Sequence, residues 1–336
     1  MKVKNILIIG LGSMGERYFK IIRKNYPNIQ IGLCRSRKNI NELKTNKKKC
    51  IYFDTIDSAI LSKPDFAILC NPSSFRTKLL KKLIENKIDL IIEKPVSNSS
   101  KNLIELDVLA KRKKVKILVG YNLRYLESLK YFKKIINDNI IGKWISVHSD
   151  VGQNIKLWRK NKDYRESVSI SKKLGGGVLL ELSHELDYIN WIFGPLKWVQ
   201  AKTISKKFFD SNVEYAANLI IGTKKIANHE LITVKMDFVR YDKTRTCYVI
   251  GENGSILWDC NKNLVKKFDI NSNRWRTIFK GKDNISQTYV NQIETMMNLK
   301  KNNLDPYVKF EDGVKVVNII EAAKLSSRQS KKILIK

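Results

Sequence analysis

The sequence predicts an α/β domain with a doubly wound parallel sheet over residues 1–120, followed by an α+β domain with a large, mostly antiparallel open sheet over residues 121–336. Two observations support this division. Before Gly120, short apolar runs alternate with amphipathic helical segments, which is typical of a parallel sheet with helices on both faces. After Gly120, segments of strand character follow one another with few helices between them, which favours an α+β domain.

The elements of the first part follow from the hydrophobic pattern. The apolar run Ile6–Ile9 predicts a buried strand, and a helix is expected from Ser13 onward. Further strands are expected at 29–34, 67–70, 89–92 and 116–119, with helices at 75–86 and 98–113. In the second part we expect helices at 128–137, 177–193, 285–300 and 311–327, and strands at 144–150, 198–203, 216–222, 230–241, 246–251 and 255–259.

A glycine pattern, Gly10-x-Gly12-x-x-Gly15, lies between the first predicted strand and the first predicted helix. Gly10 permits a tight turn, Gly12 lets the backbone approach a pyrophosphate, and Gly15 lets the helix lie close to the strand. The start of the helix supplies N–H groups and a positive dipole end for phosphates. We therefore predict a Rossmann domain whose loop binds a dinucleotide through Gly10, Leu11, Gly12, Ser13, Met14 and Gly15.

The second predicted strand leads into Arg35, Ser36 and Arg37, at a point where NAD sites place an acidic residue on the ribose 2′-hydroxyl. The next acid is Glu42. Basic side chains could bind a 2′-phosphate, so we predict NADP as the preferred coenzyme, with Arg35 and Ser36 near that phosphate and NAD as the alternative. A solvated basic turn would give the same pattern in this basic chain.

Two short segments follow predicted strands of the parallel sheet, where ligands bind in such folds: Asn71-Pro72 and Glu93-Lys94-Pro95. A lysine at a strand end can donate a hydrogen bond to a substrate oxygen. We predict that Asn71, Pro72, Glu93 and Lys94 contact the coenzyme and that Lys94 is catalytic. Most lysines in so basic a chain are solvated, so only the position of Lys94 distinguishes it.

The predicted helix over 177–193 follows three consecutive glycines and carries one of the three histidines of the chain, His184. Glu181 and Asp187 lie three residues before and after it, which places them near the same helix face. A histidine beside a carboxylate is a plausible proton carrier at neutral pH, and a structural histidine bonded to Glu181 is the alternative. No other ligands accompany these residues, so we expect no metal site.

A third set of residues could hold sugar hydroxyls, carboxylates or phosphates through arginine and aromatic side chains. Packing at a domain junction explains each of them equally well when it is taken singly. The candidate substrate-binding residues are Asn122, Arg124, Trp158, Tyr164 and Arg165.

Taken together, these segments resemble the glucose–fructose oxidoreductase and inositol dehydrogenase family, Gfo/Idh/MocA, along nearly the whole chain. The resemblance implies reversible oxidation of a secondary alcohol on a sugar to a ketone, with the nicotinamide and the substrate meeting between the domains. It places the catalytic lysine at Lys94 and the catalytic histidine at His184. The matching motifs are Gly10-x-Gly12-x-x-Gly15, Asn71-Pro72, Glu93-Lys94-Pro95, the segment 120–124, and the glycines 175–177 with His184.

The chain departs from the family pattern at two positions. The family usually has an aspartate four residues before the histidine, where this chain has Leu180, and the nearest acid is Glu181. A histidine common four residues after the Asn-Pro turn is replaced by Arg76. The segment 158–167 resembles a subgroup associated with bacterial surface-sugar pathways.

The net charge of +32 raises the question of nucleic acid or an acidic membrane surface as a partner. The basic residues are dispersed along the chain, so we expect neither, and we expect a cytoplasmic homodimer or homotetramer acting on a sugar or nucleotide sugar. Three alternatives remain open: a coenzyme-binding regulator without catalysis, a redox-neutral nicotinamide-dependent sugar enzyme, and a nucleic-acid-binding protein. Turnover with and without net coenzyme reduction distinguishes the first two, and salt-sensitive DNA retention would support the third.

Overall fold

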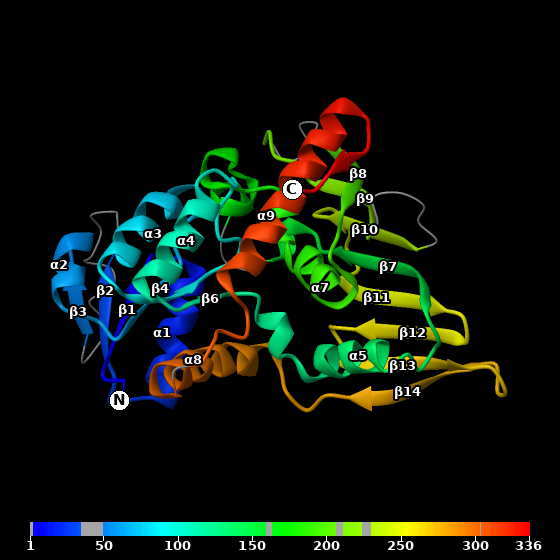
Figure 1. Ribbon diagram of the computed structural model, residues 1–336, viewed down its shortest axis with the longest axis horizontal. Helices are drawn as coiled ribbons and strands as arrows, with labels where there is room; N and C mark the ends of the chain where they lie inside the picture. The colour runs from blue at the N-terminus through cyan, green and yellow to red at the C-terminus, as the bar shows by residue number, and fades with distance from the viewer. Residues whose placement is uncertain (1–2, 35–49, 159–162, 206–210, 224–229, 303) are drawn as a thin grey trace. The chain divides into compact units, whose positions relative to one another are not determined.

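The chain is divided into two units. In the first unit, the apolar runs of the N-terminal part form parallel strands that pair into one sheet (Figure 1). The computed structural model describes residues 3–34, 50–158, 163–205, 211–223, 230–302 and 304–336. The first unit combines Met1–Tyr121 with Tyr289–Val314, and the second combines Asn122–Thr288 with Lys315–Lys336.

The sheet of the first unit has the strand order β3-β2-β1-β4-β5-β6, and every pair in it is parallel. The order reverses between β1 and β4, which confirms the predicted doubly wound sheet and marks the position where such sheets bind ligands. The strands are β1 (Asn5–Ile9), β2 (Gln30–Cys34), β3 (Cys50–Phe53), β4 (Phe66–Leu69), β5 (Asp89–Ile92) and β6 (Ile117–Val119).

Helices cover the parallel sheet, in which β1, β4, β5 and β6 are almost wholly buried, whereas the edge strand β3 is half-buried to exposed. Tyr18 of α1 packs edge-on against Tyr289 of α8, with ring centroids 5.6 Å apart, and α3 packs beside α4 (Figure 1). The helices are α1 (Ser13–Asn25), α2 (Ile56–Leu61), α3 (Arg76–Glu85), α4 (Leu103–Lys113) and α8 (Ile285–Asn302), of which α8 begins in the second unit.

The second unit is built on a nine-stranded sheet of order β14-β13-β12-β11-β7-β10-β9-β8-β15. Its neighbouring strands are antiparallel except for β7 and β10, which run parallel. The strands are β7 (Trp144–Gly152), β8 (Trp198–Ile204), β9 (Ala216–Gly222), β10 (Leu231–Asp237), β11 (Thr244–Gly251), β12 (Gly254–Asp259), β13 (Leu264–Asp269), β14 (Arg274–Lys280) and β15 (Ile333–Leu334).

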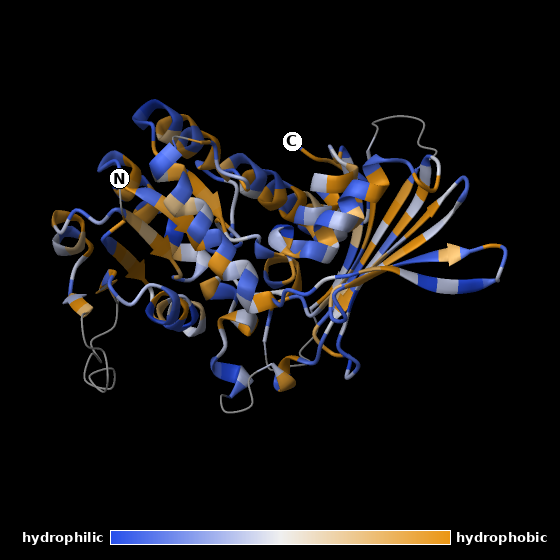
Figure 2. Ribbon diagram, turned by 90° about the horizontal axis from the view of Figure 1, so that it is seen from below, coloured by the Kyte–Doolittle hydropathy of each residue, from blue (hydrophilic) through white to orange (hydrophobic). Residues whose placement is uncertain are grey.

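Apolar and polar residues alternate along the strands of the large sheet (Figure 2). Burial alternates with them, as expected for strands with one buried and one outer face. Val147, Val249 and Trp258 lie on the buried face. Trp258 Nε1 donates a hydrogen bond of 2.9 Å to Ser128 Oγ of α5 (Glu127–Asn137), which fixes this helix on the sheet. His148, between Val147 and Ser149 on β7, faces the other side.

The remaining helices of the second unit are α6 (Val178–Glu181), α7 (His184–Phe193) and the C-terminal part of α9 (Phe310–Gln329). The prediction of one helix over 177–193 is wrong because the helical hydrogen bonds are interrupted at Leu182. A new helix starts where Asp187 N donates to Ser183 O at 3.1 Å. The helix predicted over 98–113 begins only at Leu103, after Asn102 in a left-handed conformation.

Among the α-helices and strands of the described residues, five were not predicted: β3, α2, β13, β14 and β15. Strands β13 and β14 lie at one end of the large sheet, where their residues are mostly exposed or half-buried. Strands of this kind need not be apolar, so the hydrophobic pattern gives little signal for them. Across the part of the chain described here, none of the helices combines the length and apolar composition needed to span a bilayer.

Candidate active site

The glycine loop connects β1 to α1, and the structure gives steric reasons for two of its glycines. Gly10 has φ +91°, and a Cβ there would lie 2.7 Å from Asn71 N in the turn after β4. A Cβ on Gly15 would lie 2.0 Å from Gly10 O, so only glycine lets α1 start this close to β1. The loop therefore occupies the position where the strand order reverses.

Gly12 differs from its neighbours because a Cβ there would meet no described atom within 4 Å. Packing within the first unit therefore does not require a glycine at this position. No described side chain caps α1, whose first hydrogen bond runs from Glu16 N to Gly12 O at 2.9 Å. An open backbone surface at an uncapped helix start is what a pyrophosphate needs, so these residues fit the phosphates of a dinucleotide.

The predicted ribose contacts at Arg35 and Ser36 lie outside the described residues, as does Arg159. The strand before them is in place, since Gly10 N donates to Cys34 O at the end of β2 with a distance of 3.0 Å. The chain therefore passes beside the glycine loop just before Arg35.

The turns after β4 and β5 are adjacent because Leu69 and Ile92 pair at the ends of these parallel strands. Glu93 is 4% exposed, whereas Lys94 is half-buried. The Lys94–Pro95 peptide bond is cis. The structure thus brings the predicted Asn71-Pro72 and Glu93-Lys94-Pro95 segments to the same edge of the sheet as the glycine loop.

Glu93 is held in a buried polar network that the sequence did not predict. Tyr18 Oη donates to Glu93 Oε1 at 3.0 Å and lies 3.0 Å from the side-chain amide of Gln292 on α8. Burial raises the pKa of the Glu93 carboxyl, and the charges of Lys94 and Arg76 act in the opposite direction. The network joins the helix of the glycine loop to the lysine turn.

Arg76 was noted only as a departure from the family pattern, yet its side chain lies between the two turns. Its Nε and Nη2 donate to Asn71 O at 2.9 and 2.7 Å, and its Nη1 donates to Glu93 O and Pro95 O. The side chain is buried, with 4% of the residue exposed. A charged residue four positions after the proline of an Asn-Pro turn was the signal that could have identified it.

In the second unit, the glycines before the histidine allow close packing of the chain. A Cβ on Gly176 would lie 2.4 Å from Val168 O, and one on Gly177, with φ +112°, would lie 2.5 Å from Glu214 Oε1. Gly175 also has a positive φ, +84°. The turn is buried, so these glycines fix the start of α6 rather than loosen it.

His184 is the first residue of α7 and is buried. Glu181 lies on the preceding helix, and its Oε2 accepts a hydrogen bond of 2.9 Å from Ser169 Oγ. Asp187 is bound by Arg124, whose Nε and Nη2 donate to its two carboxylate oxygens at 3.0 and 2.6 Å. The two carboxylates predicted to orient His184 therefore have separate partners.

The predicted substrate residues have different environments. Asn122 is buried, and its Nδ2 donates a hydrogen bond to Thr288 Oγ1 at 2.7 Å. Arg124 forms the ion pair with Asp187. Tyr164 lies beneath Lys156, whose Nζ is 5.6 Å from the ring centroid. Arg165 forms an ion pair with Asp163 at 2.8 Å.

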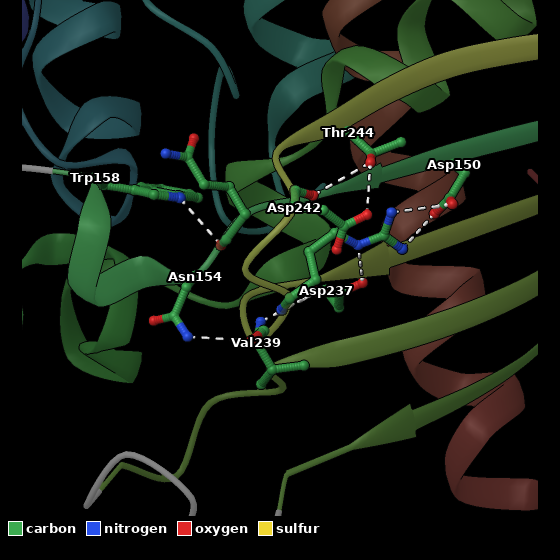
Figure 3. A network of polar contacts seen from close by, with 9 residues as sticks. Asp150, Asn154, Trp158, Asp237, Val239, Asp242 and Thr244 are labelled. Carbon is green, nitrogen blue, oxygen red and sulfur yellow. Dashed lines mark hydrogen bonds and ion pairs between the residues drawn. The ribbon is translucent and has the colours of Figure 1, made fainter.

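Trp158 is held at the end of β7 by a local network (Figure 3). Its Nε1 donates to Gln153 O at 3.2 Å, and its ring meets Phe238 edge-on at 5.1 Å. Asn154 Nδ2 donates to Val239 O at 3.1 Å, which joins the chain after β7 to the chain after β10.

The same end of the sheet is fixed by Arg240, which bridges two carboxylates. It donates to Asp150 Oδ1 at 2.6 Å and to Asp237 Oδ2 at 2.8 Å (Figure 3). A Cβ on Gly152 would lie 2.5 Å from Arg240 Nε, so glycine is needed beside this cation. The segment that carries Trp158 is therefore anchored to the carboxyl ends of the parallel pair β7 and β10.

A parallel sheet with a glycine loop at its reversal point, followed by an open and mostly antiparallel sheet, defines a two-domain dinucleotide-binding protein. Residues 4–121 match a family profile described as an oxidoreductase family, NAD-binding Rossmann fold. Residues 133–335 match the C-terminal alpha/beta domain of the same family. The chain belongs to the Gfo/Idh/MocA family of oxidoreductases, and residues 4–121 form its NAD-binding domain.

Curated relatives match part of the chain. A 2,7-anhydro-N-acetylneuraminate hydratase of Escherichia coli K12 is 24% identical over 193 residues, which are 57% of this chain and 50% of the relative. A D-xylose dehydrogenase of Paenarthrobacter nicotinovorans is 25% identical over 189 residues, 54% of this chain and 48% of the relative. The chain spans about half the length of these relatives.

Solved structures match the fold over its full length. A levoglucosan dehydrogenase in complex with NADH and levoglucosan has a TM-score of 0.85 at 15% identity, covering 99% of both chains. The WlbA dehydrogenase of Chromobacterium violaceum, in complex with NADH and UDP-GlcNAcA, has a TM-score of 0.83 at 16% identity, covering 100% of this chain and 97% of that one.

Proposed function

We propose that this protein is an NAD(P)-dependent oxidoreductase that interconverts a secondary alcohol and a ketone on a sugar, a sugar derivative or a nucleotide sugar. The observation that carries the proposal is the Glu93-Lys94-Pro95 turn, whose backbone carbonyls accept hydrogen bonds from the Arg76 side chain at the sheet edge that also bears the glycine loop. The only half-buried side chain of this turn is a lysine, which can reach a ligand at the carboxyl ends of the strands.

When bound, the nicotinamide coenzyme supplies the hydride acceptor or donor. In the oxidative direction, Lys94 donates a hydrogen bond to the reacting oxygen and stabilises its developing negative charge. His184 accepts the hydroxyl proton as a general base and later releases it to solvent. The C–H hydrogen leaves as hydride with its electron pair, so alcohol and oxidised coenzyme become ketone, reduced coenzyme and one proton.

The carboxylates of the second unit have supporting roles in this proposal. The two-bond contact between Arg124 and Asp187 fixes the first turn of α7, and with it the backbone of His184. Glu181, bonded to Ser169, fixes the preceding helix α6. Both carboxylates thus help to fix the backbone position of His184.

Several observations support a sugar-like substrate. Three of the four proteins named above are a xylose dehydrogenase, a levoglucosan dehydrogenase and a dehydrogenase crystallised with a nucleotide sugar. The chain carries 64 basic and 32 acidic residues, so its field attracts anionic substrates such as nucleotide sugars. We propose a role in surface-polysaccharide sugar biosynthesis, with Trp158, Tyr164 and Arg165 contacting the substrate.

The coenzyme preference is proposed from the sequence after β2. Arg35 and Ser36 suit the 2′-phosphate of NADP, whereas an acid would repel it. Replacement of Arg35 by Ala should raise the KM for NADP at least tenfold, about 1.4 kcal/mol of lost binding, and leave the KM for NAD within about twofold. Equal changes for both coenzymes would contradict the preference.

Self-association is proposed from the outer face of the large sheet. Ile204, Ile220 and Leu231 lie there on β8, β9 and β10, and each is more than 40% exposed. Exposed apolar side chains on three neighbouring strands of one sheet face suit a homodimer or homotetramer. Light scattering of the wild type and of Ile220→Lys tests this, because a subunit interface on this face would be broken by the buried charge.

The deciding experiment follows nicotinamide absorbance with a panel of sugars, sugar acids and nucleotide sugars, using NAD and NADP and both reduced forms with keto-sugars. Lys94→Ala and His184→Ala should each lower kcat by about 100- to 10,000-fold, while His184→Ala binds coenzyme like the wild type. Matched controls are Lys101→Ala, an exposed lysine, and His148→Ala on the outer face of the sheet. Full turnover in both active-site variants would exclude the assigned roles.

A redox-neutral reaction is the second candidate, and one observation favours it. The Escherichia coli relative is named a hydratase, an activity without net oxidation. Such a reaction would form product, detected by mass, with no lasting change in nicotinamide absorbance. Coenzyme binding without any product from the panel would favour a regulator without catalysis.

A further inference from the structure

The position of Arg76 is not explained by the stability of its own helix. It is the first residue of α3, whose first turn contains no acidic residue. The start of a helix carries a positive partial charge and disfavours a cation there. The side chain is also buried, and a buried cation is costly unless its donors are satisfied. Other contacts must therefore hold this guanidinium in place.

Those contacts are backbone carbonyls from both strand-end turns. Asn71 O accepts from Nε and Nη2, while Glu93 O and Pro95 O both accept from Nη1. The two carbonyls of the second turn belong to the residues on either side of Lys94. The peptide groups around Lys94 are thus tied through one side chain to the neighbouring turn.

Only arginine can make this set of bonds. The guanidinium has five N–H donors in a planar fork, so it can serve carbonyls on two sides at once. A lysine ammonium is a point charge with three donors, and an imidazole donates at most two hydrogen bonds. A histidine, which the family commonly has here, could serve at most half of these four contacts.

We propose that Arg76 is a positioning residue that fixes the backbone on both sides of Lys94 and so directs the lysine ammonium at the reacting oxygen. This inference rests on the proposed function, because it requires Lys94 to act in turnover. Small displacements of a catalytic group can lower the rate about 100-fold. The contacts of Arg76 on which this argument rests are with backbone carbonyls, so the residue has a positioning role and carries out no chemical step.

The test compares Arg76→Lys, which keeps the charge, and Arg76→Gln, which keeps part of the hydrogen bonding, with the matched control Arg23→Lys. Arg23 lies in the same unit and donates to Ile29 O at 2.8 Å, remote in sequence from both turns. We expect kcat to fall about 10- to 100-fold in both Arg76 variants and to stay within twofold in Arg23→Lys. An unchanged thermal unfolding midpoint, followed by circular dichroism, verifies that each variant is folded.

A second measurement separates positioning from a general structural role. If Arg76 acts through Lys94, adding Arg76→Lys to Lys94→Ala should change the residual rate less than twofold, because the directed group is already gone. The inference would be overturned if Arg76→Lys lowered kcat by the same factor in Lys94→Ala as it does in the wild type. A wild-type kcat in the single variant Arg76→Lys would also overturn it. Full activity of Lys94→Ala would instead remove the proposed function on which the inference rests.

Discussion

The ion pair between Arg124 and Asp187 gives a quantitative prediction for Asp187→Asn. The two side chains are 3% and 1% exposed, and hydrogen bonds of 3.0 and 2.6 Å join them. Asparagine has nearly the same size but no charge, so the substitution leaves the guanidinium buried without its counter-ion. Breaking a buried pair in this way costs about 3–5 kcal/mol.

The assay is thermal unfolding of the purified protein, followed by circular dichroism. For a unit of this size, 1 kcal/mol corresponds to about 2–4 °C, so the midpoint should fall by about 6–20 °C. The double variant Arg124→Met/Asp187→Leu should recover most of this loss, because a buried pair can be replaced by apolar side chains at little cost. Asp138→Asn, which breaks the exposed pair with Lys134, serves as the control and should leave the midpoint unchanged.

Two results would refute this reasoning. If Asp187→Asn lowered the free energy of unfolding by less than about 1 kcal/mol, this would mean that water reaches Arg124 and that the ion pair behaves as an exposed one. If the double variant lost as much free energy of unfolding as its two single substitutions do together, the two side chains would not depend on each other.

Further predictions concern the glycine loop and the buried thiols. Gly15→Ala should prevent stable folding of the first unit, because its Cβ would lie 2.0 Å from Gly10 O. Gly12→Ala should keep the unfolding midpoint but weaken NADPH binding at least tenfold, measured by fluorescence titration, because its methyl group points into open space at the helix start. Burial raises the pKa of Cys260 to about 11, so the folded state keeps a proton that the unfolded state loses near pH 9. Stability should therefore fall as the pH rises from 9 to 11, and Cys260→Ala should reduce that fall; an unchanged slope in urea titrations would contradict it.

Local features of the sequence predicted the first unit well because its elements are encoded over short distances. The strand at Asp89–Ile92 and the helix start at Ser13 were predicted at their observed bounds. Such elements are specified by apolar runs, glycines and turn residues that lie within a few positions of one another in the sequence. The family resemblance of the motifs then predicted the oxidoreductase fold, and the profile matches confirmed it.

The sequence did not reveal which side chains support the candidate site. Arg76 was visible only as a departure, and nothing near Asp187 in the sequence predicts that its partner is Arg124, 63 residues earlier. The break between Glu181 and His184 was also missed, because the apolar pattern continues through it.

The sequence by itself determined the class of fold, the coenzyme loop and the identity of the lysine and histidine candidates. Only the tertiary structure decided that residues 289–314 join the first unit, that Gln292 and Glu93 both contact the Tyr18 hydroxyl, and that Arg76 binds the backbone of the lysine turn. The physical reason is the range of the interactions. Turns and helix starts depend on neighbouring residues, whereas a buried hydrogen bond depends on side chains that meet only after the chain has folded.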